Sequence, residues 1–135
     1  MAKPQRVTYF KISLEDKPGS LLAVARDLKA KNVGLIGLRG LDIQAGRAEV
    51  TLIARNPDKL RNACKSSGMG FEEATGFFVK GADKTGALVK TLEQLAKAGV
   101  NILVSDAMAV SGNYGFFIQV APADVEKTAA ALGAK

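Results

Sequence analysis

Apolar and polar residues alternate in some parts of the chain and follow a helical spacing in others. Residues 7–14 alternate and run into a Pro-Gly turn, which predicts a strand. The next apolar residues recur at the i, i+3, i+4, i+7 spacing of a helix that packs on a core, at Leu21, Val24, Ala25 and Leu28. The same stripe returns later in the chain, at Leu88, Leu92, Leu95 and Ala96.

Each predicted helix is followed by two apolar runs joined by a tight turn, which predicts a strand pair. The first pair covers residues 34–43 and 47–54, and the second covers residues 102–110 and 114–121. A Pro then opens a further helical segment after each pair, in Asn-Pro-Asp at residues 56–58 and Pro-Ala-Asp at residues 122–124. The order β-α-β-β-α therefore occurs twice.

An internal repeat accounts for this duplication. A shift of 67 residues aligns residues 16–35 with residues 83–102 without a gap, and six positions in twenty are identical. They are Asp16/Asp83, Lys17/Lys84, Gly19/Gly86, Leu21/Leu88, Leu28/Leu95 and Val33/Val100. Unrelated sequences of average composition would share roughly one or two. The chain is therefore predicted to be a tandem duplication.

The predicted fold is α+β, with two tandem ferredoxin-like βαββαβ units of antiparallel sheet and helices on one face. The first unit is expected at residues 1–74 and the second at residues 75–135. The sequence stops just beyond the last predicted helix, so the second unit lacks a clear last strand. Residues 69–80 must close the first unit and open the second, either as one long strand or as two strands hinged at Gly76.

The amino-acid composition excludes several kinds of catalytic and metal site. The 135 residues contain no histidine and one cysteine, which removes histidine-based catalysis, imidazole metal ligands and an internal disulfide. Cys64 is expected to pack inside a helix. No catalytic pair or metal cluster can be assembled, so we expect no enzyme activity, no metal and no cofactor. Without a signal peptide or a membrane-length apolar run, a cytoplasmic protein without a membrane segment is expected.

The net charge of +6 is unevenly distributed. Residues 1–67 hold 13 Lys/Arg against 6 Asp/Glu (+7), whereas residues 68–135 hold 6 against 7 (−1). A basic half could face a polyanion, but its cations are scattered singly and never form a run. A solvated surface is the favoured interpretation.

The repeated Asp-Lys-x-Gly-x-Leu turn has two possible roles. Asp16 and Asp83 stand where helix N-caps are expected, and Gly19 and Gly86 are expected inside the first helical turn. Glycine costs helix stability but lets a ligand approach the free N–H groups of a helix N-terminus. The residues alone leave a carboxylate site and a tightly packed structural turn equally open.

The segments DKPGSL and DKTGAL, followed by NVGL and GVNI at the helix ends, resemble the ACT domain, a βαββαβ module that binds amino acids and regulates enzymes. In that family, modules pair side by side and hold an amino acid between the turn of one module and the second strand of its neighbour. The resemblance covers nearly the whole chain. The ligand groups that it implies are Asp16, Lys17, Gly19, Ser20 and Leu21 in the first copy, and Asp83, Lys84, Thr85, Gly86, Ala87, Leu88, Asn101 and Ile102 in the second.

The second copy is the better equipped of the two. Asn101 offers a donor and an acceptor at a strand start that is expected to face the turn, whereas its equivalent, Gly34, offers no side chain. Asn32 and its equivalent Gly99 are predicted to be left-handed C′ residues that end the first helix of each copy.

Two alternatives to an amino-acid-binding regulatory protein remain. Residues 112–120 imitate the aromatic strand of an RNA-recognition motif, but Tyr114, Phe116, Ile118 and Val120 form an apolar row typical of a core, which disfavours nucleic acid. A degenerate module that only mediates association is the other alternative. Open sheet edges favour a homodimer in either case. The expected partners are an amino acid, a second copy and an enzyme or regulator controlled in trans.

Overall fold

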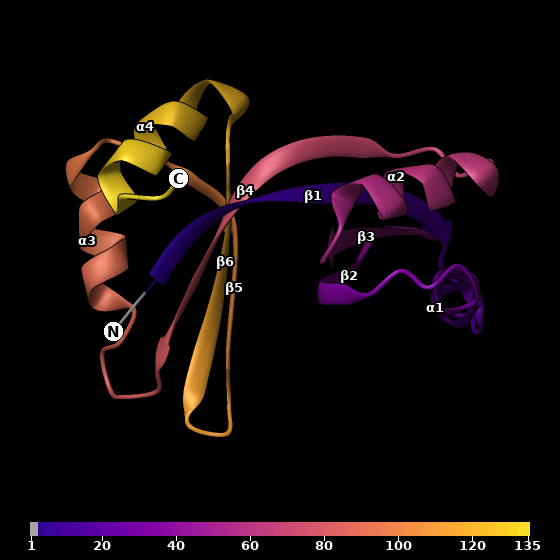
Figure 1. The fold of residues 1–135 in the computed structure, drawn as a ribbon, viewed down its shortest axis with the longest axis horizontal. Helices are drawn as coiled ribbons and strands as arrows, with labels where there is room; N and C mark the ends of the chain where they lie inside the picture. The colour runs from indigo at the N-terminus through magenta and orange to yellow at the C-terminus, as the bar shows by residue number, and fades with distance from the viewer. Residues whose placement is uncertain (1–2) are drawn as a thin grey trace. The chain divides into compact units, whose positions relative to one another are not determined.

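The computed structural model describes residues 3–135 and has the predicted α+β order (Figure 1). The elements are β1 (Lys3–Glu15), α1 (Ser20–Ala30), β2 (Leu35–Gln44), β3 (Arg47–Ala54), α2 (Pro57–Ser66), β4 (Glu72–Ala82), α3 (Val89–Lys97), β5 (Ile102–Val110), β6 (Asn113–Val120), a 3-10 turn η1 (Pro122–Asp124) and α4 (Val125–Leu132). No helix among these residues is long and apolar enough to cross a lipid bilayer.

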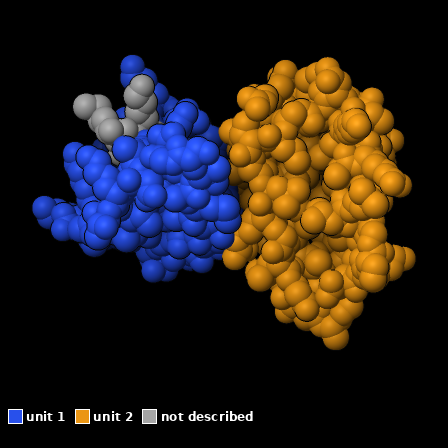
Figure 2. Space-filling model, turned by 90° about the horizontal axis from the view of Figure 1, so that it is seen from below, with its two compact units in different colours: residues 1–7, 75–135 blue, residues 8–74 orange. Residues whose placement is uncertain are grey.

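The chain divides into two compact units, coloured separately in Figure 2. Unit 2 holds residues 8–74, and unit 1 holds residues 75–135 together with the described residues 3–7. The strands follow the order β2-β3-β1-β4-β6-β5, and both β1 and β4 contribute residues to each unit. Each unit therefore has the 4-1-3-2 strand order of a ferredoxin-like module.

The last strand position of unit 1 is filled from the other end of the chain. No strand follows α4 in the described residues, as expected from the sequence. The first residues of β1 belong to this unit instead, and β1 is the neighbour of β4 in the sheet. Arg6 extends from this part of β1 to α4, where its Nη1 lies 2.8 Å from Oε2 of Glu126. The apparent gap in the second repeat is thus closed without a further strand.

The segment shared by the two units is a single strand. Of the two alternatives for residues 69–80, the structure has one continuous strand, β4, which runs through Gly76. It begins at Glu72, three residues later than expected, and ends at Ala82.

The helix ends follow the local sequence. Asn32 and Gly99 both adopt a left-handed φ, of 57° and 71°, and the residue after each donates its N–H back into the last helical turn. The predicted C′ roles are confirmed. Asn56 caps α2 through Oδ1, which accepts hydrogen bonds from the N–H groups of Asp58 and Lys59.

The core of unit 2 lies between its strands and helices α1 and α2. Its buried members are Phe10, Ile12, Val24, Leu28, Val33, Val50, Leu52, Ala54, Leu60, Ala63 and Cys64. Cys64 is free and 1% exposed, which confirms its packing role. The stripe predicted for α1 is only half right, because Leu21 and Ala25 are exposed. Only one i, i+4 pair of α1, Val24 and Leu28, reaches the sheet.

The core of unit 1 is built in the same way from β4, β6, α3 and α4 (Figure 1). Here α3 buries Thr91 and Leu95, the equivalents of Val24 and Leu28. The predicted stripe is wrong for Leu92 and Ala96, which are exposed. The buried face of α3 is therefore centred on Thr91 and Leu95, and Leu92, which was predicted to be buried, lines a surface cavity instead.

Candidate functional site

The repeated turn does not have the capping geometry predicted for it. Neither Asp16 nor Asp83 caps a helix: the N-cap residues are Gly19 for α1 and Leu88 for α3, and neither cap uses a side-chain hydrogen bond. A stretch of turn separates each aspartate from its helix. The aspartate N–H instead donates to the tip of the neighbouring hairpin, from Asp16 to the carbonyl of Gly46 at 3.0 Å and from Asp83 to that of Gly112 at 2.9 Å.

The glycines of the repeat serve backbone conformation. Gly19 has φ 89° and Gly86 has φ 80°, and both precede the helix instead of lying in its first turn. Residues with a Cβ are strained at such angles, so the conformation itself explains why glycine stands at both positions. A Cβ at Gly19 would meet no atom within 4 Å, so close packing does not require glycine there.

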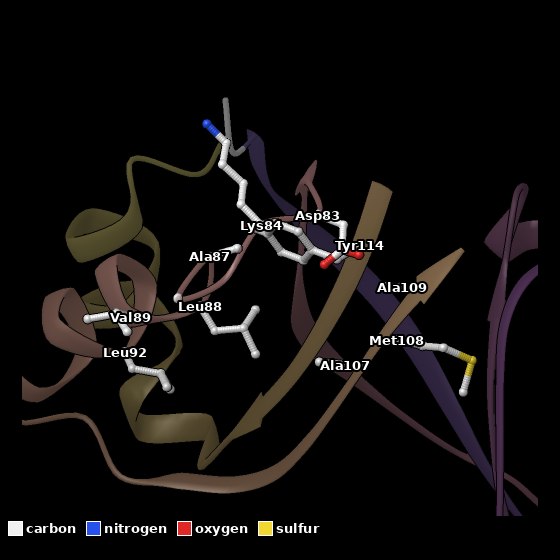
Figure 3. A pocket seen from close by; sticks show the side chains of 11 residues that line it. Asp83, Lys84, Ala87, Leu88, Val89, Leu92, Ala107, Met108, Ala109 and Tyr114 are labelled. Atoms are coloured by element: carbon white, nitrogen blue, oxygen red, sulfur yellow. The ribbon is translucent and has the colours of Figure 1, made fainter. Parts of the chain in front are cut away.

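In unit 1 the turn forms one wall of an open pocket of about 330 Å³ (Figure 3). The lining residues are Asp83, Lys84, Gly86, Ala87, Leu88, Val89, Leu92, Ala107, Met108, Ala109 and Tyr114. They come from the turn, the first turn of α3, the outer strand β5 and the start of β6. Five of the residues predicted for the second copy are therefore brought together, and the facing wall is a stretch of β5 that the sequence did not indicate.

The pocket combines polar groups at the turn with an apolar floor. The N–H groups of Thr85, Gly86 and Leu88 donate to no backbone acceptor in residues 3–135, whereas those of Ala87 and Val89 close the turn. Asp83 supplies a carboxylate, and Lys84 supplies an ammonium without an ion pair among the described residues. Figure 3 shows the Leu88 and Leu92 side chains on the α3 side of the pocket and the Met108 side chain pointing away from them. Ala107 and Ala109, which pair with Phe116 and Tyr114 of the core face, supply the apolar side chains of the β5 wall. Such a pocket offers separate partners for an anion, a cation and an apolar group.

Three predicted residues of the second copy lie elsewhere. Thr85 belongs to the turn but does not line the pocket. Asn101 precedes β5, and Ile102 pairs with Val120 at the open end of the β5-β6 hairpin and packs against the core. The pocket lies near the hairpin tip, roughly 25 Å away along the strand. Within its own unit, therefore, Asn101 does not face the turn.

The first copy forms a related but electrostatically different surface. A cavity of about 410 Å³ in unit 2 contains Lys17, Gly19 and Ser20, whereas Asp16 and Leu21 lie outside it. Lys17 Nζ lies 2.9 Å from Oε2 of Glu15. This pair lowers the pKa of Glu15 and raises that of Lys17, chiefly through the hydrogen bond between them. The lysine of the first copy is thus ion-paired at the surface, whereas Lys84 has Ala82 at the position equivalent to Glu15.

Tyr114 is the largest wall residue that the sequence reasoning did not assign to the site. Its ring lies over Gly81, where an added Cβ would be only 2.7 Å from Cε1 of the ring. The two residues face each other in the β4-β6 pair, and the equivalent pair in unit 2 is Leu14 and Ala48. The larger residue of the facing pair is on β6 in unit 1 (Tyr114) and on β1 in unit 2 (Leu14). A comparison of facing positions across the repeats could have revealed this difference.

The aromatic row of β6 is part of the core. Tyr114, Phe116, Ile118 and Val120 are all buried in unit 1, together with Phe77 of β4. Stacking of nucleic-acid bases requires exposed aromatic faces, and this row presents none. The structure thus supports the core interpretation of these residues over the RNA-recognition alternative.

Comparison with known proteins gives structural matches only. No protein-family model and no curated protein matches the sequence. Protein BT0572 from Bacteroides thetaiotaomicron matches with a TM-score of 0.84 and 25% identity, over 96% of this chain and 88% of that chain. The regulatory subunit of aspartate kinase from Thermus thermophilus, in a ligand-free form, matches with a TM-score of 0.68 and 16% identity, over 98% and 93%. The corresponding subunit from Thermus flavus matches with a TM-score of 0.63 and 15% identity, over 98% and 94%.

These matches extend over nearly the whole of each chain, so they concern the tandem arrangement and not one module alone. The identities are low, and the likeness is one of fold. It agrees with the two βαββαβ units seen in the chain and with the ACT resemblance of the repeated turn. The chain therefore has the tandem ACT-type fold that its sequence predicts.

Proposed function

We propose that this chain is an amino-acid-binding regulatory protein without catalytic activity of its own. The observation that carries the proposal is the pocket between the Asp83–Leu88 turn and β5. Its volume of about 330 Å³ lies at the lower end of the range of small-molecule sites. The fold shared with isolated regulatory subunits of aspartate kinase supports the same class of function.

The pocket chemistry suits a zwitterion. The ammonium of an amino acid would lie near the Asp83 carboxylate, and its carboxylate would accept from the free N–H groups of the turn. The side chain would then extend over Leu88, Leu92 and Ala107. This apolar floor favours an amino acid with an apolar side chain, because burial of apolar surface would add to its affinity.

A second copy of the chain would complete the site. β5 is an outer strand, and it exposes Leu103, Met108 and Val110, with Met108 74% exposed. An exposed apolar edge of this length is suited to strand pairing. Antiparallel pairing of two β5 edges would bring Asn101 of one copy beside the hairpin tip of the other. In that dimer Asn101 and the turn would meet, although they are far apart within one unit.

Regulation would follow from the location of the ligand. An amino acid bound between turn and paired strand stabilises the paired state over the unpaired one, and so shifts the population that an enzyme or regulator recognises in trans. The chain would act through this change of assembly.

The test is a thermal-unfolding screen against the twenty amino acids. A ligand at about a hundred times its dissociation constant adds roughly 2.7 kcal/mol, which corresponds to several degrees for a chain of this size. Asp83→Asn should weaken binding of the positive ligand roughly tenfold through the lost ion pair, whereas Asp16→Asn, its repeat equivalent, should leave binding unchanged. No shift with any amino acid, or equal effects of the two variants, would reject the proposed site.

A further inference from the structure

A second cavity in unit 1 lies beside the amino-acid pocket. It encloses about 320 Å³ and lies among the start of β1, the end of β4 and helices α3 and α4. Its lining residues are Pro4, Gly81, Ala82, Lys84, Ala87, Lys90, Thr91, Gln94, Tyr114 and Leu132. Lys84, Ala87 and Tyr114 also line the first pocket, so the two cavities share a wall.

The charged groups of this cavity are all cations. Lys84 and Lys90 contribute two ammonium groups, and no carboxylate lines the cavity. Neither lysine forms an ion pair in the part of the chain that the structure describes. Figure 3 shows the Lys84 side chain extending away from Leu88 and Leu92 of the first pocket. Lys90 and Thr91 also lie in the first turn of α3, where the helix dipole is positive.

Thr91 is the most informative residue of the cavity. It is 3% exposed and occupies the α3 position that packs against the sheet, yet its hydroxyl has no hydrogen-bond partner among residues 3–135. Among the described residues, every fully buried side-chain polar atom has a hydrogen-bond partner. Because the Thr91 hydroxyl has none among these residues, its oxygen is not fully buried, and the cavity that Thr91 lines is the space onto which it opens. This hydroxyl can therefore donate a hydrogen bond to a ligand in the cavity. Gln94 contributes less, because its Nε2 donates to the carbonyl of Ala131 at 3.4 Å.

The equivalent cavity in unit 2 provides an internal comparison. The 67-residue repeat places Leu14, Glu15, Ala23 and Val24 where unit 1 has Gly81, Ala82, Lys90 and Thr91. Unit 2 therefore has one lysine, ion-paired with Glu15, and an apolar residue in place of the threonine. The shared fold does not require cations or a hydroxyl at these positions, since the same helix packs on the same sheet without them.

We infer that the cavity of unit 1 formed by Lys84, Lys90 and Thr91 binds a small organic dianion that carries a phosphate or two carboxylates. Two ammonium groups match two negative charges, and the Thr91 hydroxyl donates a further hydrogen bond to the same oxygens. The inference concerns a ligand other than the amino acid and does not depend on the proposed function.

The experiment is calorimetric titration of the full chain with three probes, namely inorganic phosphate, glycerol 3-phosphate and succinate, in a chloride buffer of fixed ionic strength. Saturable binding of at least one probe is expected. A preference for either phosphate probe would identify a phosphate ligand, and a preference for succinate would identify a dicarboxylate. Absence of saturable binding of all three probes at millimolar concentration would overturn the inference.

Two variants and one control locate the site. Lys90→Gln should weaken binding of the preferred probe roughly tenfold, and Thr91→Val, which reproduces Val24 of unit 2, should weaken it severalfold with little change of volume. Lys29→Gln removes the same charge from an exposed position on α1 and should leave the affinity unchanged. Equal losses for Lys90→Gln and Lys29→Gln would show general charge attraction and would also overturn the inference. Parallel titrations of Lys90→Gln with amino acids measure the first pocket alone. They show whether the variant affects only the binding of the dianion probes.

Discussion

The close packing of the Tyr114 ring over Gly81 leads to a quantitative prediction. A carbon at the Cβ position of residue 81 would lie 2.7 Å from Cε1 and 3.0 Å from Cζ of Tyr114. Carbon atoms in favourable contact are about 3.5–4.0 Å apart, so the buried ring would have to move. We expect Gly81→Leu to lower the free energy of unfolding by about 1–3 kcal/mol, as overpacking does. A gain of roughly 0.5–1 kcal/mol from replacing a strand glycine is too small to compensate.

The reverse change in the partner should also be costly. Tyr114 is 7% exposed, and Tyr114→Ala would leave a cavity in the core of unit 1, at a cost of about 3–5 kcal/mol. In the double variant, the leucine at residue 81 would occupy the space vacated by the ring. The facing pair would then match Leu14 and Ala48 of unit 2, which the fold already accommodates.

The double-mutant cycle is measured by urea unfolding followed by circular dichroism, with the slope of each transition recorded. The double variant should be more stable than the sum of the single effects predicts, by about 1–3 kcal/mol. Ala48→Gly, combined with Gly81→Leu, serves as a control because the two residues belong to different units, and their effects should be additive. Additive behaviour of the Gly81 and Tyr114 changes would refute the idea that the two residues share one volume.

Three further predictions concern other parts of the chain. Arg61 lowers the pKa of Glu73 below its ordinary value of 4.5 through a 2.7 Å hydrogen-bonded ion pair. The pair therefore stabilises the fold fully above pH 4.5, and this stabilisation is lost as the pH falls through the lowered pKa. In unfolding measurements, Arg61→Gln should lower stability slightly at pH 7 and leave it almost unchanged at pH 3. Burial raises the pKa of the Cys64 thiol, so a thiol reagent should label it only as fast as the protein opens, and rapid labelling of the native protein would contradict its packing role. Gly99→Ala should destabilise by about 1–2 kcal/mol because φ is 71°, whereas Asn32→Gly at the equivalent position should change stability little, and equal losses in the two variants would exclude backbone conformation as the cause.

Those parts of the fold that depend on nearby residues could be predicted from the sequence. Strand alternation, the Asn56 cap and the left-handed residues Asn32 and Gly99 are local features, and the structure confirms them. The roles predicted for Asp16 and Asp83 failed because their N–H groups bond to hairpin tips about 30 residues away. Local capping rules do not include such partners.

The first residues of β1 could not be predicted to form a strand, for a different reason. Residues 3–6 read Lys-Pro-Gln-Arg, which has no apolar alternation, so only the later residues were predicted to form a strand. This segment lies before the register of β1 with β3, which runs from Phe10 to Glu15, and its neighbour in unit 1 is β4. The side of the segment away from β4 therefore resembles a sheet edge, where a proline is tolerated and polar side chains can face water.

The candidate site was predictable in its turn and not in its opposite wall. The repeat identified Asp83 and Gly86, but Ala109 and Tyr114 lie beside the turn only because the β5-β6 hairpin folds next to it. Residue spacing alone carries no signal for that approach. The exposed position of Leu92 likewise depends on how α3 is rotated on its sheet, which is decided by the packing of Thr91 and Leu95.

The contribution of residues 3–7 to unit 1 sets an order of events during synthesis. Unit 2 has all its residues once residue 74 has left the ribosome, but unit 1 must wait for α4, which ends at Leu132. At about 5–20 residues per second, unit 1 remains incomplete for roughly 3–12 s after the last residue of unit 2 has been synthesised. Throughout this interval the nascent chain carries an unfinished strand edge, a surface for which chaperones or a second nascent copy can compete. Shorter delays, produced by faster translation of the second half, should therefore raise the yield of correctly closed protein.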